Sequence, residues 1–140
     1  MKEHYSFMIE NSESYKVHIV ILTWNNNKIL KRCLESIENV DHKNLTISVI
    51  DNNSSDDSLR MISENFPNVQ TIKNSKNFKF GRGYNEGLKK INVEDNDFII
   101  LLNDDTIVSR NFINELINPL MKNQKAIIST PKILYSSNIN

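Results

Sequence analysis

The apolar residues of this chain fall into short runs separated by polar stretches. Val17–Thr23 (VHIVILT) and Leu45–Ile50 (LTISVI) are almost continuously β-branched or aliphatic, which is typical of strands buried on both faces of a sheet. Shorter runs at Val69–Ile72, Phe98–Leu102 and Ala126–Ser129 have the same character. The pattern predicts five strands.

Helical spacing fills the stretches between these runs. Helices are predicted over Lys28–Asn39 and from a cap at Ser55 or Asp56 to Asn65. A third helix is expected after the polar stretch KNSKNFKFGRGYNEG and ends at about Ile91, and a fourth lies around Phe112–Leu120. Parallel neighbours need crossover connections, so strands that alternate with helices indicate a parallel sheet. We therefore expect an α/β fold, a Rossmann-like, mainly parallel sheet flanked by helices.

Length and composition limit the possibilities further. The 140 residues fit one domain, which we expect over residues 17–140 after an N-terminal extension at 1–16. Lys+Arg and Asp+Glu balance at 17 each, so the chain has no overall basic field for nucleic acid. No segment is long and apolar enough to span a membrane, and the charged N-terminus does not resemble a signal peptide. These features favour a cytoplasmic location.

The cysteine and the histidines are expected to be structural. Cys33 shares a helical face with Ile29, Leu30, Leu34 and Ile37, which predicts a small core residue. The three histidines, His4, His18 and His42, are too scattered for a zinc site or a nucleophile relay.

A polar cluster follows each of three predicted strands. The clusters are Thr23–Asn25, Asp51–Asn53 and Asn103–Asp105. Ligands of parallel α/β sheets bind at the carboxyl ends of the strands. We therefore expect the three clusters to converge on one edge of the sheet.

The acidic residues in these clusters each allow two interpretations. Asp104 and Asp105 repel each other, which a hard cation such as Mg²⁺ or Mn²⁺ would offset while it holds a diphosphate; alternatively, they form a solvated turn. Asp51 can accept a hydrogen bond from a base or a ribose, or it can simply begin a turn.

The glycine-rich stretch GRGYNEG, residues Gly81–Gly87, resembles a phosphate-binding turn. Its third glycine is one residue late for a dinucleotide fingerprint, and it follows the third strand instead of the first. Gly81 and Gly83 predict a tight turn with Arg82 available for phosphate. The alternative is a helix entry with a solvated arginine.

Taken in order, the segments VILTWNN, VIDNNSSDDS, NFKFGRGYNEGL and IILLNDDTIV resemble the nucleotide-sugar half of inverting family 2 glycosyltransferases, particularly the rhamnosyltransferase-like branch. The resemblance covers about residues 17 to 135. It implies a GT-A fold, a UDP- or TDP-linked nucleoside diphosphate sugar as donor, Mg²⁺ or Mn²⁺, and a role in polysaccharide biosynthesis.

The resemblance also assigns roles to single residues. It implies a donor site in which Thr23 and Asn25 line the nucleotide pocket, Asp51 contacts the base, Asn53 and Asn85 lie near it, Asp104 approaches ribose or phosphate, and Asp105 is the metal-binding carboxylate of a DXD-type motif. Arg82 of the glycine-rich stretch is expected to be available for phosphate at the same site.

One departure from the family pattern concerns the acceptor side. The family's general base lies in the second half of its domain, whereas Glu115 is the one acidic residue after Asp105 here, within a predicted helix. We therefore expect a truncated donor domain that binds without turnover. The alternatives are a non-catalytic nucleotide-sugar-binding module, or a site completed by a partner chain or a second copy. The acceptor is not specified.

Overall fold

The structure is a computed structural model, and it describes residues 15–95, 97–123 and 125–134. Almost all of the expected N-terminal extension, including His4, lies outside the described residues. Strands and helices alternate in the order β1 (Val17–Thr23), α2 (Asn27–Ile37), β2 (Leu45–Asp51), α3 (Ser58–Asn65), β3 (Gln70–Lys73), α4 (Phe80–Leu88), β4 (Phe98–Asn103) and α5 (Phe112–Lys122).

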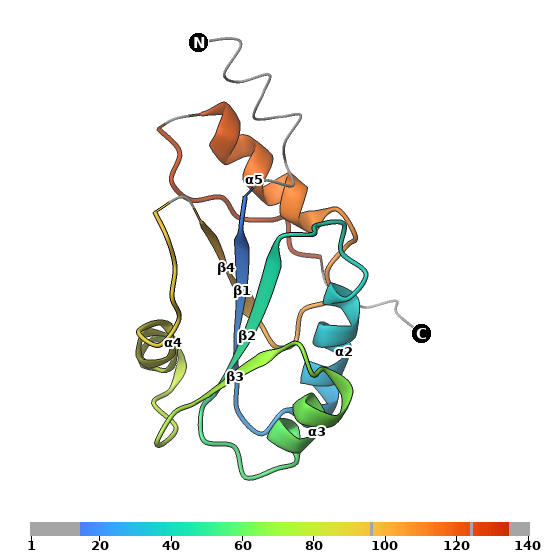
Figure 1. The fold of residues 1–140 in the computed structure, drawn as a ribbon, viewed down its shortest axis with the longest axis vertical. Helices are drawn as coiled ribbons and strands as arrows, with labels where there is room; N and C mark the ends of the chain where they lie inside the picture. The colour runs from blue at the N-terminus through green and yellow to red at the C-terminus, as the bar shows by residue number, and fades with distance from the viewer. Residues whose placement is uncertain (1–14, 96, 124, 135–140) are drawn as a thin grey trace.

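The four strands form one parallel sheet in the order β3-β2-β1-β4 (Figure 1). Thr23 pairs with Asp51, and Leu22 pairs with Asn103, so the carboxyl ends of β1, β2 and β4 lie at the same level. The predicted Rossmann-like α/β fold with a mainly parallel sheet is confirmed.

The expected fifth strand over Ala126–Ser129 is wrong. The described residues of this segment form no strand, and Ile127 and Ile128 are 87% and 76% exposed. A run of apolar residues becomes a strand only when its backbone pairs with a neighbour. Within the described part of the chain, this run pairs with none.

Each face of the sheet is covered by different helices. Alternate residues of β1 point to opposite faces, because side chains alternate along a strand. Val17, Ile19 and Ile21 pack with α2, α3 and α5, whereas Val20 and Leu22 pack with Tyr84 of α4. Figure 1 shows α2 and α3 on one side of the sheet and α4 on the other.

β4 is an edge strand and is half-buried, although five consecutive apolar residues are typical of a strand that is buried on both faces. Ile99 and Leu101 are 45% and 55% exposed, while Leu102 is buried. Ile99 pairs with His18 and Leu101 with Val20, which places both on the face that α4 covers. α4 packs over β1 and β2, so it leaves this part of the face open.

Two helix predictions also need correction. α3 begins at Ser58 after Asp57, later than expected. Ser55 bonds Asn25 in the loop that follows β1, and Asp56 accepts the backbone N–H groups of Asn27 and of Ser58 at the start of α3. In α2, the buried face consists of Leu30, Cys33, Leu34 and Ile37, and the remaining predicted member, Ile29, is 45% exposed. Cys33 itself is fully buried, as expected for a core residue.

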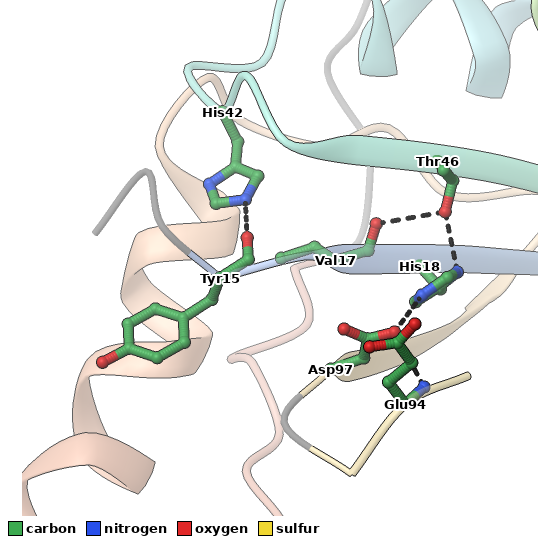
Figure 2. Close-up of polar contacts among 7 residues, drawn as sticks. All are labelled: Tyr15, Val17, His18, His42, Thr46, Glu94 and Asp97. Carbon is green, nitrogen blue, oxygen red and sulfur yellow. Dashed lines mark hydrogen bonds and ion pairs between the residues drawn. The ribbon is translucent and has the colours of Figure 1, made fainter. Parts of the chain in front are cut away.

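His18 links the strands near the amino end of the sheet (Figure 2). Its Nε2 lies 2.8 Å from Asp97 Oδ2, and its Nδ1 lies 2.7 Å from Thr46 Oγ1. A carboxylate accepts only, so Nε2 carries the proton. Asp97 also accepts the backbone N–H of Glu94 at 3.0 Å. The predicted structural role of His18 is confirmed.

Candidate functional site

The carboxyl ends of β1 and β4 form the centre of the site. The chain runs from β1 to β2 and β3 on one side and then returns to place β4 on the other side of β1. Such a reversal opens a crevice beyond the strand ends. There Thr23 donates a hydrogen bond of 2.7 Å to Asp104 Oδ2, which joins the two strand tips.

Asp105 differs from Asp104 because its carboxylate has no hydrogen-bond partner among the described residues. The side chain is exposed, and among the described residues it has no hydrogen bond or ion pair. An exposed, unpartnered carboxylate beside the Thr23–Asp104 pair is a suitable oxygen ligand for a divalent cation. Among the described residues, no group of three or more His, Cys, Asp or Glu side chains is arranged to hold a metal ion.

The two carboxylates create a negative field at this edge. The Cys33 thiol lies behind them, and burial, followed by the charge of Asp104, raises its pKa to about 12. Burial likewise raises the pKa of Tyr84 to about 12, with a smaller contribution from Asp104. Both groups therefore stay protonated at neutral pH, so neither adds negative charge to the crevice.

The hydroxyl of Tyr84 is inserted between β1 and β4. Tyr84 Oη accepts the backbone N–H of Leu22 at 3.3 Å and donates to the carbonyl of Leu102 at 2.9 Å. In a parallel pair with Leu22 opposite Asn103, these two backbone groups would otherwise bond each other. Nothing in the sequence pattern distinguishes Tyr84 from an ordinary core aromatic, so this role is not predictable from the sequence.

Asp51 and Asn25 hold the two loops beside this crevice. Both oxygens of Asp51 accept the backbone N–H of Ser54, at 3.0 and 3.2 Å, and the residue is fully buried. Asn25 Oδ1 accepts the backbone N–H groups of Ser55 and Asp56 at 2.7 and 3.3 Å. The loop after β1 is thereby fastened to the loop after β2.

Asn52 is a second residue whose role the sequence analysis missed. It is buried, its Oδ1 accepts from Asn74 Nδ2 and Phe78 N at 3.1 Å each, and its Nδ2 donates to Asn77 Oδ1 and the Lys79 carbonyl. The end of β2 is thus joined to the segment that leads into α4. Its position in the polar cluster after β2 was the available signal.

The glycine-rich stretch lies within α4, so the tight turn expected at Gly81 and Gly83 is wrong and the alternative, a helix entry, describes it. A Cβ at Gly83 would lie 3.0 Å from Asn52 and Leu22, and one at Gly87 would lie 2.3 Å from Ile50. Nothing lies within 4 Å of the Cβ position at Gly81. Gly83 and Gly87 therefore let α4 approach the sheet closely.

Arg82 and Asn85 lie on the outer surface of α4. The Arg82 side chain is 65% exposed and stacks over Phe78 at 4.6 Å. Asn85 is exposed and has no hydrogen bond among the described residues. Neither residue shares a hydrogen bond or an ion pair with Asp104 or Asp105. The structure thus joins Thr23 to Asp104, with Asp105 next in the chain, but no hydrogen bond or ion pair among the described residues joins Arg82 or Asn85 to them.

An open cleft of about 420 Å³ adjoins the loop after β2. Asn53 lies on its rim, exposed and with a left-handed backbone at φ 64°. The cleft is lined by Asn53, Lys73, Asn74, Ser75, Phe78, Glu86 and Lys90. The cleft therefore lies between the loop after β2 and the outer surface of α4.

The sequence of this chain matches the family model described as "Glycosyl transferase family 2" over residues 18–140. The chain belongs to glycosyl transferase family 2. This confirms the family that the motifs indicate.

Two family members share close to a third of their aligned residues with the chain. A dolichyl N-acetyl-alpha-D-glucosaminyl phosphate 3-beta-D-2,3-diacetamido-2,3-dideoxy-beta-D-glucuronosyltransferase of Methanococcus voltae is 30% identical over 116 residues, which are 78% of this chain. A GalNAc(5)-diNAcBac-PP-undecaprenol beta-1,3-glucosyltransferase of Campylobacter jejuni is 32% identical over 94 residues, or 64% of the chain. The alignments span 35% and 29% of those proteins.

Solved glycosyltransferase structures share the fold. S. aureus TarS 1-349 in complex with UDP-GlcNAc superposes with a TM-score of 0.65 at 20% identity, over 76% of this chain and 31% of that one. The mannosyltransferase PcManGT from Pyrobaculum calidifontis, in complex with GDP-Man and Mn²⁺, gives 0.67 at 14% identity, over 84% and 38%. These similarities confirm a fold of the GT-A type. Within the described residues, no helix combines the length and apolar character that crossing a bilayer requires.

Proposed function

We propose that this chain is the donor-binding part of a glycosyltransferase and that it binds a nucleoside diphosphate sugar together with a divalent cation. The observation that carries the proposal is the pair of strand tips at the β1–β4 crevice. Thr23 engages Asp104 at 2.7 Å, and the adjacent Asp105 carboxylate is exposed and unpartnered. The similar structures in complex with UDP-GlcNAc and with GDP-Man and Mn²⁺ support the same ligand class.

Asp105 is the proposed metal ligand. Mg²⁺ and Mn²⁺ prefer oxygen ligands and keep coordination positions for phosphate and water, which suits a site where the protein offers one free carboxylate. When bound, the ion would neutralise charge on the diphosphate leaving group. Asp104 orients Thr23 and adds to the negative field that attracts the cation.

The base is proposed to bind beside β2, with a preference for uracil or thymine. Asn25 and Asn53 lie in the loops at this position, and Asp51 lies at the end of β2. Because Asp51 is fully buried and both its oxygens accept from Ser54, a base reaches it only if the turn at Asn53–Ser55 opens. Arg82 and Asn85 would contact the donor from α4.

The second candidate is a binding module without turnover. Glu115 is exposed, hydrogen-bonds Asn111 on its own helix, and lies on α5. That helix begins beside Arg110, which pairs at 2.7 Å with Asp41 in the loop before β2, at the end of the sheet opposite Thr23 (Figure 1). Glu115 is therefore unable to act as a base at the proposed donor site, and we propose that this chain alone binds the donor without transferring it.

The acceptor is proposed to be a sugar linked to a polyprenyl phosphate or diphosphate. Both similar enzymes carry such an acceptor in their names, dolichyl phosphate in one and PP-undecaprenol in the other. The product would serve glycan or polysaccharide biosynthesis. We also propose that the chain belongs to the rhamnosyltransferase-like branch. Binding of a TDP-linked deoxysugar in the donor titration would support this branch.

Calorimetric titration tests the donor site. UDP, TDP, GDP and their sugars are titrated with and without Mn²⁺, and we expect Mn²⁺ to tighten binding of at least one of them. Asp105→Ala should remove that gain, whereas Glu64→Ala, at an exposed carboxylate on α3, should retain it. Absence of any nucleotide binding, or an unchanged Mn²⁺ gain in Asp105→Ala, would refute the proposal.

A further inference from the structure

Positive charge is concentrated in one segment of a chain whose overall net charge is zero. Residues 73–90 contain six of the 17 basic residues and one of the 17 acidic residues, a net charge of +5. The remaining residues carry the balancing −5. The overall neutrality therefore conceals a strongly asymmetric distribution of charge.

The structure gathers five of these cations on one continuous surface, which we call the α4 basic face: Lys73, Lys76, Arg82, Lys89 and Lys90. Contacts around Phe78 and Glu86 join its members. Lys76 and Arg82 lie over the Phe78 ring at 5.4 and 4.6 Å, Lys89 pairs with Glu86 at 3.2 Å, and Lys90 Nζ lies 3.0 Å from the Lys73 carbonyl.

Internal pairing leaves most of this charge uncompensated. Glu86 is the one acidic side chain within the face, and it is shared by Arg82 at 3.9 Å and Lys89 at 3.2 Å. The Arg82 and Lys89 side chains are 65% and 67% exposed. The open cleft beside Phe78 adds Lys73 and Lys90 to its lining. A surface of this kind raises the local concentration of anions.

We propose that the α4 basic face docks this protein on the anionic headgroups of a phospholipid membrane. Clusters of four to eight basic residues bind anionic bilayers, at about 1 kcal/mol for each residue near the surface. The inference rests on the proposed polyprenyl-linked acceptor, because such an acceptor is embedded in the bilayer. Asn52 joins the end of β2 to the segment that leads into α4, so docking on the outer surface of α4 would hold the carboxyl end of the sheet near the membrane plane.

Vesicle sedimentation tests the proposal. The full chain is mixed, without nucleotide, with vesicles of phosphatidylcholine alone or with phosphatidylglycerol. We expect binding to the anionic vesicles only, and we expect added salt to weaken it because salt screens surface charge. Lys76→Gln/Lys89→Gln should lower the partition coefficient about 25-fold, about fivefold for each charge removed. Both side chains are exposed, and neither hydrogen-bonds the backbone.

The matched control removes the same charge from the opposite side of the sheet. Arg32→Gln/Lys122→Gln changes exposed residues of α2 and α5, and its partition coefficient should fall less than twofold. An equal loss in both double variants would overturn the proposal, as would absence of binding to anionic vesicles. Tighter binding to an oligonucleotide than to the vesicles at equal salt would also overturn it and identify nucleic acid as the partner.

Two further measurements distinguish membrane docking from donor binding. Asp105→Ala should bind vesicles like the parent chain, so failure of the donor proposal leaves the docking result intact. UDP affinity with Mn²⁺ should stay within twofold in Lys76→Gln/Lys89→Gln. A loss of UDP affinity as large as the loss of vesicle binding would overturn docking, because the face would then be serving the donor diphosphate.

Discussion

The hydroxyl of Tyr84 donates to the carbonyl of Leu102 across 2.9 Å, from a helix into the carboxyl end of a strand. The same oxygen accepts the N–H of Leu22 on the neighbouring strand. One phenol thus takes the place of a ladder hydrogen bond at the crevice where Thr23 and Asp104 meet. The separation of the two strand tips depends on this side chain.

Replacing Tyr84 with Phe should destabilise the fold. The substitution leaves the N–H of Leu22 and the carbonyl of Leu102 without their shared partner, and each unsatisfied buried group is costly. We expect the free energy of unfolding to fall by about 1–3 kcal/mol, measured by urea denaturation. Tyr15→Phe removes a hydroxyl outside the sheet and should change it by less than about 0.5 kcal/mol. Equal effects in the two variants would contradict the role of the Tyr84 hydroxyl between the two strands.

Replacing Lys79 with Gly should stabilise the fold. Lys79 has φ 66° and ψ −167°, a region that is essentially restricted to glycine. Relief of this strain outweighs the added entropy of glycine in the unfolded chain, so we expect a gain of about 1 kcal/mol in the free energy of unfolding.

Lys76→Gly is the control for Lys79, because Lys76 is exposed and is not among the residues with positive φ. It should lose stability by a few tenths of a kcal/mol, roughly the backbone entropy that glycine adds. Chemical denaturation of both variants gives the comparison. A loss of stability in Lys79→Gly would show that the strained geometry is not present in solution.

Two glycines of α4 should respond in opposite directions to alanine. A Cβ at Gly87 meets Ile50 Cδ1 at 2.3 Å, so Gly87→Ala forces α4 away from the sheet and should cost about 1–3 kcal/mol. A Cβ at Gly81 meets nothing within 4 Å, so Gly81→Ala should stabilise by about 0.5 kcal/mol through helix propensity. Thermal unfolding followed by circular dichroism measures both. Similar shifts at the two positions would argue against the close packing of α4.

Acid should remove the contribution of Asp97 to stability. The backbone N–H of Glu94 and then His18 stabilise its charged form, which lowers the pKa of the carboxyl below its ordinary 3.8. A carboxyl with a depressed folded-state pKa contributes stability above its unfolded pKa, and this is lost as the pH falls through the folded value.

The test for Asp97 compares the parent chain with Asp97→Asn by urea unfolding from roughly pH 5 downward. The difference in free energy of unfolding should be largest above pH 3.8 and should shrink below it. A difference that stays constant across this range would show that the carboxylate has no special stabilisation in the folded state.

The amino-acid pattern alone predicts the α/β class, the parallel sheet and the convergence of the three polar clusters. These follow from local pattern and from connectivity, because β-branched runs alternating with helices permit few other arrangements and their carboxyl ends must share an edge. The motif order also identified the family, which the match over residues 18–140 confirms. The roles of single residues toward a donor stay predictions.

Which side chains are free to bind a ligand depends on the three-dimensional packing of the chain. Asp51 and Asp105 look alike in the sequence, yet one is enclosed by its own turn and the other is exposed without a partner. Tyr84 and Asn52 act through hydrogen bonds to segments far away in the chain. Burial, pairing and strand separation arise from packing in three dimensions, so no local pattern of residues carries them.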